Sequence, residues 1–336
     1  MLFEIQSATR PCPLTAGNDA ILLSNKDRHG NSLKNICWRK SGLIGVDPIP
    51  IQNVEQFYRI TYRQRYKQTV YPQKRHVLRA ARCALNRFKR ISPYLKQIAT
   101  PELRTLDAGA SSGEFVFLMK KLGHTASGIE ANEGYATHAV KELGLDVANC
   151  TFSEFSGRPE SFDLITLFHV LEHLEFPVSE LQRLAGYLQS GGLMVIEVPN
   201  ILHPKMKFSR KWHEAHLFGF SVETLQTTAA MAGLTPLSCG TIEDGGNLFG
   251  VFKKGHAISS EDASRRLDGH FEDAIQQLRH NSNLRYYAQS STWLKIPRKL
   301  HVHFEEINTA NAFPNSLTLL NAVYSNRSET LEAVRL

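Results

Sequence analysis

The sequence has no run of about 18 apolar residues and no apolar stretch near its N-terminus. A transmembrane helix needs about 20 such residues, and a signal peptide needs a shorter apolar core after a basic start. The first ten residues instead include Glu4 and Arg10. We therefore expect neither a membrane span nor a signal peptide, and we expect a cytoplasmic protein.

Cysteine is also scarce, which argues against a disulfide framework. The five cysteines are odd in number and widely scattered, as free thiols in a reducing compartment would be. A zinc ribbon takes four ligands, usually from two C-x-x-C pairs, and here Thr15 and Lys40 or Ser41 occupy the partner positions. Residues 1–50 are thus predicted to be a degenerate zinc-ribbon-like segment without metal. The cysteines are Cys12, Cys37, Cys83, Cys150 and Cys239.

Composition is that of an ordinary globular protein, with 336 residues, 42% hydrophobic and 21% charged. The length predicts one large α/β domain or a core with appendages. The net charge of +7 is unevenly distributed. Residues 59–104 contain 13 Lys or Arg and one acid, which gives +12 and leaves 7 − 12 = −5 for the rest of the chain. The basic character is therefore local.

The segment 51–100 is predicted to be basic and helical. Tyrosines alternate with Lys and Arg in its first half, and after Pro72 apolar residues recur at helical spacing. An alternative use of this segment is as a phosphate-tracking surface for nucleic acid, although no known RNA-binding module or base-flipping motif is present. The apolar positions are Val77, Leu78, Ala81, Leu85 and Phe88.

From Arg104 onward, short apolar runs alternate with helical stretches, a pattern typical of a doubly wound parallel sheet. Gly191 and Gly192 are expected to end the third of these helices, and Ser221 is expected to cap a helix that reaches Ala232. Residues 257–336 are predicted to be a mostly helical C-terminal extension. The predicted strands are Thr105–Asp107, Ala126–Glu130, Asp146–Cys150, Asp163–Phe168, Leu193–Val198, Leu237–Ile242 and Leu248–Lys253, and the predicted helices between the first five are Gly113–Leu122, Gly134–Leu143 and Pro177–Gln189.

The strongest chemical signal is the segment Leu106–Phe115, LDAGASSGEF, in which a strand enters a glycine turn and then a helix. Small residues let the backbone approach a ligand, and a helix start exposes free N–H groups. A dinucleotide fingerprint fails because Ser111 and Glu114 occupy its second and third glycine positions. The segment resembles the acidic-x-Gly-x-Gly-x-Gly motif of class I S-adenosylmethionine-dependent methyltransferases, with Ser111 in place of the middle glycine.

Other segments match that family in order. Glu130 closes the second strand, where an acid can accept hydrogen bonds from both ribose hydroxyls. Residues 161–174, 188–200 and 216–221 resemble the family's fourth strand with its loop, the turn into its fifth strand, and a later loop before a helix. The resemblance implies S-adenosyl-L-methionine as cofactor, held by Asp107, Gly109, Ser111, Gly113, Glu130, Ala131, Phe168 and His169.

The motif His169-Val-Leu-Glu172-His173 has a rival interpretation, because H-x-x-E-H on a helix can bind zinc. Here it follows a strongly β-like run, and Pro177 leaves little room for a long helix. We therefore predict no metal site. The resemblance places His169 beside the reactive methyl group, while Glu172 and His173 shape the loop or contact substrate.

Three histidines are the candidates for catalysis. His213 and His216 lie in an irregular stretch after the fifth strand, where such folds build the substrate side of the cleft. An imidazole titrates near neutral pH and suits general base catalysis. We favour His216 as the base because Leu217, Phe218 and Phe220 would bury its surroundings; His213 and His169 are the other candidates.

The sequence thus predicts an S-adenosylmethionine-dependent methyltransferase with a core over 101–256 and appendages at both ends. Resemblance to the subgroup with an N-terminal ribbon implies a small-molecule acceptor, and we expect a sugar or nucleotide-linked sugar. A nucleic-acid methyltransferase and a non-catalytic cofactor-binding protein stay open as alternatives.

Overall fold

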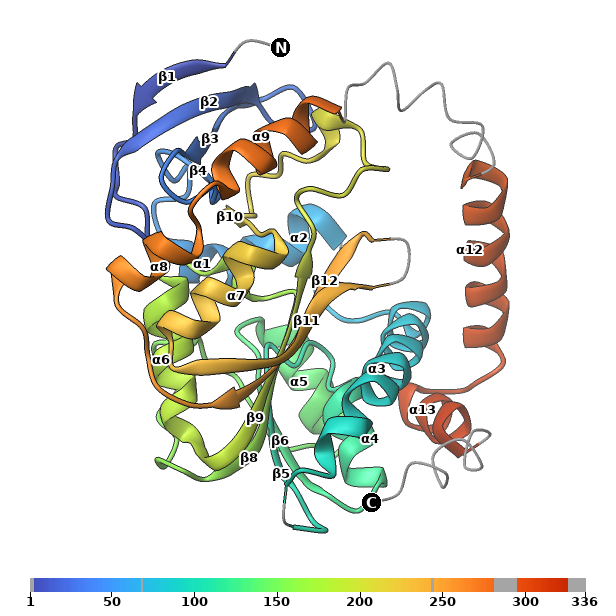
Figure 1. The fold of residues 1–336 in the computed structure, drawn as a ribbon. Helices are drawn as coiled ribbons and strands as arrows, with labels where there is room; N and C mark the ends of the chain where they lie inside the picture. Colours follow the sequence, from blue (N-terminus) through green and yellow to red (C-terminus); the bar gives the residue numbers. More distant parts are fainter. Residues whose placement is uncertain (1–2, 68, 99, 243–244, 281–294, 326–336) are drawn as a thin grey trace. The chain divides into compact units, whose positions relative to one another are not determined.

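A computed structural model describes residues 3–67, 69–98, 100–242, 245–280 and 295–325 (Figure 1). It separates into two compact units, each described by itself below. Unit 1 comprises Met1–Val54, Leu167–Gly186 and Leu193–Thr292, and unit 2 comprises Glu55–Thr166, Tyr187–Gly192 and Trp293–Leu336.

A seven-stranded sheet has the order β11-β12-β9-β8-β5-β6-β7. β5 is parallel to β6 and to β8, β6 is parallel to β7, and β11, β12 and β9 are antiparallel to one another in turn. β8 is almost wholly buried, as its apolar run predicts for a parallel sheet covered on both faces. The predicted α/β fold with a seven-stranded sheet is confirmed. The strands are β5 (Arg104–Ala108), β6 (Thr125–Ile129), β7 (Val147–Ala148), β8 (Phe162–Phe168), β9 (Leu188–Pro199), β11 (Leu234–Ile242) and β12 (Asn247–Lys254).

The basic segment is helical, and its predicted apolar stripe is confirmed. All five apolar positions predicted after Pro72 are buried in α3. On its polar side, Arg79 forms two hydrogen bonds with Glu306, and Arg82 pairs with Glu305 at 2.9 Å, both acids belonging to α12. The helices here are α1 (Val54–Gln56), the π-helix η1 (Phe57–Thr61), α2 (Tyr62–Lys67), α3 (Lys74–Leu95), α4 (Glu114–Lys121), α5 (Glu133–Lys141), α12 (Lys295–Asn311) and α13 (Ser316–Ser325).

In unit 1 the N-terminal residues build a second sheet, of order β1-β2-β3-β4-β10. Cys12 and Ser41, two positions of the predicted zinc-ribbon-like segment, lie together with Sγ and Oγ 3.3 Å apart, and both are buried. The absence of metal there stays a prediction. The elements are β1 (Glu4–Ser7), β2 (Asp19–Lys26), β3 (Ser32–Trp38), β4 (Ile44–Val46), β10 (Phe218–Gly219), the 3-10 helices η2 (Leu171–His173) and η3 (Phe208–Arg210), and the helices α6 (Pro177–Tyr187), α7 (Val222–Met231), α8 (Ser260–Arg266) and α9 (His270–His280).

One boundary predicted from the sequence is wrong. The structure ends α6 at Tyr187 and begins β9 at Leu188, so the glycine pair lies inside the strand instead of ending the helix. Gly191 has φ +80°, and a Cβ on Gly192 would lie 3.2 Å from the carbonyl oxygen of Asp163. The pair therefore serves a backbone bend and a close approach between neighbouring chain segments. Ser221 does cap α7, with a capping box to Thr224, as predicted.

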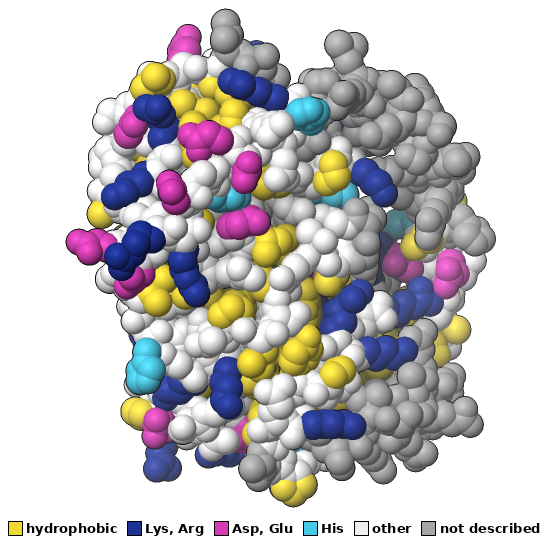
Figure 2. All heavy atoms as spheres, in the orientation of Figure 1, with side chains coloured by type: hydrophobic (Ala, Val, Ile, Leu, Met, Phe, Trp, Pro, Cys, Tyr) yellow, Lys and Arg dark blue, Asp and Glu magenta, His cyan; other side chains and the backbone are white. Residues whose placement is uncertain are grey.

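Apolar side chains gather on the surface of unit 1 that carries β1, β2 and α9 (Figure 2). They line an open groove of about 530 Å³ that Arg39 and Arg279 border. Among the described residues, we find no helix with the length and apolar character needed to cross a membrane. The apolar lining residues are Phe3, Ile5, Ile21, Phe271 and Ile275.

The glycine turn gives a test of the fold. Gly113 and Gly123 have φ of +90° and +89°, but a Cβ on Gly113 would lie 2.5 Å from Leu145 Cδ1, whereas a Cβ on Gly123 meets nothing within 4 Å. We expect Gly123→Ala to lower the free energy of unfolding by about 1–2 kcal/mol through backbone strain alone. Gly113→Ala should cost about 2–4 kcal/mol because overpacking adds to that strain. Urea denaturation measures both, and equal losses would contradict the packing argument.

Candidate functional site

The glycine turn after β5 is held against the end of β6. The N–H groups of Gly109 and Ala110 both donate to the carbonyl of Ile129, each at 2.9 Å. Gly109, Ser111 and Gly113 all have positive φ, of 91°, 53° and 90°. Glycine adopts this left-handed backbone conformation without steric cost, which accounts for Gly109 and Gly113. Ser111, between them, has the same conformation although it is less favourable for a residue with a side chain.

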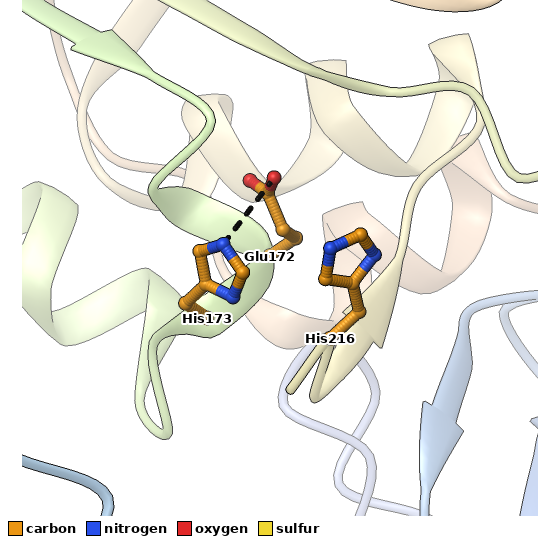
Figure 3. Close-up of side chains that lie close together, drawn as sticks. All are labelled: Glu172, His173 and His216. Carbon is orange, nitrogen blue, oxygen red and sulfur yellow. Dashed lines mark ion pairs between the residues drawn. The ribbon is translucent and has the colours of Figure 1, made fainter. Parts of the chain in front are cut away.

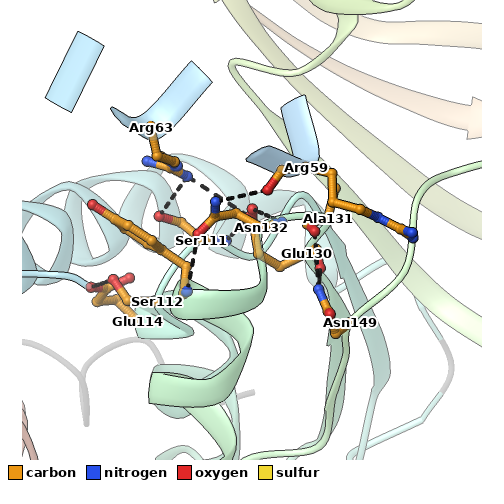
Figure 4. A network of polar contacts seen from close by, with 10 residues as sticks. Arg59, Arg63, Ser111, Ser112, Glu114, Glu130, Ala131, Asn132 and Asn149 are labelled. Atoms are coloured by element: carbon orange, nitrogen blue, oxygen red, sulfur yellow. Dashed lines mark hydrogen bonds and ion pairs between the residues drawn. The ribbon is translucent and has the colours of Figure 1, made fainter. Parts of the chain in front are cut away.

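Glu130 links the turn to the next loop (Figure 4). One carboxylate oxygen accepts the N–H of Ser111 at 2.8 Å, and the other accepts the N–H of Asn132 at 3.0 Å. The side chain is only 8% exposed. Each carboxylate oxygen can accept more than one hydrogen bond, so Glu130 keeps acceptor capacity for hydroxyl groups of a ligand.

Arg63, which sequence reasoning missed, lies over this region from α2. Its guanidinium donates to Ser111 Oγ at 3.2 Å and lies 3.8 Å from Glu130 Oε2 (Figure 4). It also lies over the ring of Tyr135, 4.0 Å from the ring centroid. The backbone of the same segment is also engaged, since Asn132 Nδ2 donates to the carbonyl of Arg59 at 3.0 Å. Nothing in the run of basic residues singles out Arg63, so the sequence carried no usable signal for it.

Two buried carboxyl groups flank the turn. Burial raises the pKa of Asp107 to about 6, against the hydrogen bond that Thr166 Oγ1 donates to it at 2.7 Å. Burial likewise raises the pKa of Glu114 to about 7, opposed by the Ser112 hydroxyl and by Arg63. A bound cation would favour the charged form of both groups, so the turn suits a positively charged ligand.

The structure therefore brings together six of the eight predicted cofactor-binding residues in unit 2. Ala131 is among them, its carbonyl accepting from Asn149 Nδ2 at 3.0 Å. Phe168 and His169 belong to unit 1. The binding role of all eight stays a prediction; the six are Asp107, Gly109, Ser111, Gly113, Glu130 and Ala131.

In unit 1, His169 lies between two carboxylates. Its Nε2 is 3.3 Å from Glu197 Oε1, and its Nδ1 is 3.5 Å from Glu172 Oε1. Burial alone would lower the pKa of His169, but the two carboxylates outweigh it and raise the pKa to about 9. Glu197 was missed from the sequence, although a lone acid in the apolar run of β9 was a visible signal.

Glu172 is the centre of a cluster with His173 and His216, which Figure 3 shows facing one another. Burial would raise the pKa of Glu172, but His173, His169 and His216 lower it to about 2. Within the described residues neither of its oxygens meets hydrogen-bond geometry, and the ligand atoms of the three side chains lie within 4.8 Å of one another. One carboxylate and two imidazoles could hold a divalent cation. Only the last three residues of H-x-x-E-H, Leu171–His173, are helical, in a single 3-10 turn and not in the longer helix that the zinc motif requires.

Of the three predicted catalytic histidines, His216 belongs to this cluster, while His213 and His169 each contact one of its members. His213 stacks on His216 with ring centroids 4.6 Å apart, and its Nδ1 accepts the N–H of Ala215 at 3.0 Å. Burial lowers the pKa of His213 to about 3 and that of His216 well below its usual range. At neutral pH, His213 and His216 are therefore uncharged while His169 is protonated.

His169 offers a direct measurement of this arrangement. We expect NMR titration to give His169 a pKa of about 9, and Glu197→Gln to lower it because one of the two carboxylates is lost. A folded-state pKa above the unfolded value stabilises the fold below about pH 6.5, and this contribution is lost as pH rises through 9. Glu214→Gln is the control. A His169 pKa near 6.5 in the wild type would show that the carboxylates do not govern it.

Comparison with known proteins identifies part of the chain. Residues 75–238 match the family model described as a methyltransferase domain. The ubiquinone biosynthesis O-methyltransferase of Parvibaculum lavamentivorans is 33% identical over 104 residues, which is 30% of this chain and 41% of that protein. The enzyme of the same name from Dinoroseobacter shibae is 27% identical over 180 residues, 48% of this chain and 70% of that protein. The chain thus spans about two fifths of the length of the first relative.

Among solved structures, the Burkholderia thailandensis 1,6-didemethyltoxoflavin-N1-methyltransferase, with bound 1,6-didemethyltoxoflavin and S-adenosylhomocysteine, aligns with a TM-score of 0.46 and 17% identity. The alignment covers 66% of this chain and 96% of that one. The family match confirms the predicted methyltransferase domain, while the ribbon-bearing subgroup stays a prediction. Residues 75–238, just under half of the chain, are therefore assigned to a methyltransferase domain.

Proposed function

We propose that this protein transfers a methyl group from S-adenosylmethionine to a hydroxyl group of a small molecule. The observation that carries the proposal is the glycine turn held by Glu130 at the ends of two parallel strands. Open α/β sheets bind ligands at the carboxyl ends of their strands. His169 directly follows β8, which runs parallel to β5.

The residues of the turn fit the cofactor. Glu130 retains acceptor capacity for ribose hydroxyls, and the first turn of α4 directs backbone N–H groups toward the glycine turn. Asp107 and Glu114 supply negative charge when they ionise, and the cofactor carries a sulfonium and an ammonium group. The bound cofactor supplies an activated methyl group, so the protein has to orient the acceptor, exclude water and remove a proton.

A hydroxyl acceptor is supported by the names of the relatives, which are O-methyltransferases of ubiquinone biosynthesis. Within hydroxyl compounds, a sugar or nucleotide-linked sugar is the narrower proposal, and it rests on the sequence resemblance alone. A panel of phenolic and sugar acceptors assayed with labelled S-adenosylmethionine separates the two classes.

His216 is proposed as the base that takes the acceptor proton. Burial lowers its pKa, which keeps the imidazole in the neutral, proton-accepting form near pH 7 but also makes it a weaker base. Glu172, which stays ionised, would stabilise the imidazolium that forms. His169 is already protonated at that pH and so cannot take the acceptor proton; we propose that it contributes a positive charge to the site instead.

The basic segment gives little support to the nucleic-acid alternative. Arg79 and Arg82 are paired with acids of α12, and Arg59 is paired with Glu154. Cations that already face carboxylates contribute less to phosphate binding than solvated ones.

Cofactor binding should depend on Glu130. We expect Glu130→Gln to weaken S-adenosylhomocysteine binding about 10- to 100-fold, because the amide replaces an acceptor with a donor toward the ribose and toward the Ser111 or Asn132 N–H. Isothermal titration calorimetry measures the dissociation constant. The control is Glu133→Gln, which changes an exposed acid at the start of α5, three residues after Glu130. Failure of the folded wild type to bind would remove the proposed function.

Turnover should depend on His216. His216→Ala is expected to lower turnover about 10²-fold or more, on whichever acceptor of the panel is methylated, while cofactor affinity stays within about threefold. His256→Ala, which removes an exposed histidine, serves as control. Unchanged turnover would contradict the base assignment, and loss of the folded state would show a structural role.

A further inference from the structure

We propose that helix α13 positions the glycine turn of residues 109–113, with Tyr324 and Ser316 as its positioning residues. The inference rests on the proposed function, because it concerns the site at which that function would bind its cofactor. α13 belongs to unit 2 together with the turn, and Figure 1 shows it beside α3 and α4. The C-terminal extension, to which the sequence assigned no role, would thereby become part of the cofactor-binding machinery.

Tyr324 connects α13 to the start of α4. Its phenol donates a hydrogen bond to the carbonyl of Glu114 at 2.9 Å, and it is only 1% exposed. Glu114 is the first residue of α4 and directly follows Gly113, the last glycine of the turn. The ring of Tyr324 also packs on Phe117, one turn further along α4, with centroids 6.0 Å apart. The contact is therefore made at the end of α4 that begins at the turn.

Ser316 makes a second connection, to α5. Its hydroxyl lies 3.0 Å from His138 Nε2, and both side chains are buried. α5 begins after Asn132, whose backbone N–H is held by Glu130. Burial lowers the pKa of His138, whereas Glu142 and a hydrogen bond with the Ser112 backbone raise it. The bond with Ser112 places this imidazole beside the glycine turn as well. α13 thus contacts both helices that start at the candidate cofactor site.

The contacts of Tyr324 and Ser316 hold α4 and α5 in place. α4 spans only Glu114–Lys121, and a helix this short is marginal without tertiary contacts. The Tyr324 hydrogen bond is buried and acts from outside the helix, so its loss should loosen the first turn of α4 even though Phe115 and Val116 stay buried. A site held slightly more loosely binds its ligand less tightly, because more conformational freedom is lost on binding.

The chain provides a matched control on the same helix. Asn321 Oδ1 accepts from Lys121 Nζ at 2.9 Å, at the opposite end of α4, and this pair is exposed. Removing it disturbs the contact between α13 and α4 without touching the turn. Asn321→Ala therefore separates an effect on the turn from a general loosening of α13.

The experiment uses the full-length chain and S-adenosylhomocysteine as probe, at a temperature well below the unfolding transition of every variant. We expect Tyr324→Phe and Ser316→Ala each to weaken binding about 3- to 10-fold, as the loss of one buried hydrogen bond allows. Asn321→Ala should stay within about twofold. Hydrogen exchange should show lost protection at Phe117 and its neighbours in Tyr324→Phe but not in Asn321→Ala.

Wild-type affinity and wild-type protection in Tyr324→Phe would overturn the proposal, as would equal weakening by Asn321→Ala. If Tyr324→Phe does not fold, Ser316→Ala decides by the same two readouts, with protection followed at the start of α5. If the wild type binds no S-adenosylhomocysteine, the proposed function fails. Hydrogen exchange then still shows whether α13 holds the turn.

Discussion

The candidate cofactor site depends on the way in which the carboxylate of Glu130 holds two loops at once. Parallel strands end at the same edge of a sheet, so the loops after β5 and β6 emerge side by side. Their backbone N–H groups need acceptors, and Glu130 supplies one oxygen to each loop. The positive φ of Gly109 and Gly113, on either side of Ser111, lets the first loop follow a sharp path.

Electrostatics in unit 1 follow from what each imidazole faces. His169 faces two carboxylates and is held protonated, whereas His213 and His216 face other imidazoles in buried surroundings and are held neutral. The opposite pKa directions within one cluster therefore need no special chemistry of any residue. Burial lowers the pKa of all three imidazoles, and only at His169 do two carboxylates, Glu172 and Glu197, outweigh it.

Features that depend on local sequence were predictable. The strand, glycine turn and helix of residues 104–122, the capping serine of α7 and the apolar stripe of α3 all follow from short-range patterns, and the structure confirms them. Arg63 and Tyr324 were not predictable, because each meets the turn through contacts 48 and 210 residues away in the chain. The boundary error at Gly191 has a related cause, since a glycine pair signals a bend without saying which element it interrupts.

The distance in sequence between the helices α3 and α4 and their partners α12 and α13 also bears on how the chain folds. Arg79 meets Glu306 across 227 residues, and Tyr324 meets Glu114 across 210. Contacts this remote carry a loop-closure cost before they contribute any stability, and they form late. During synthesis, the apolar stripe of α3 and the first turn of α4 emerge long before α12 and α13, so unit 2 waits for the last-made helices before its packing is complete.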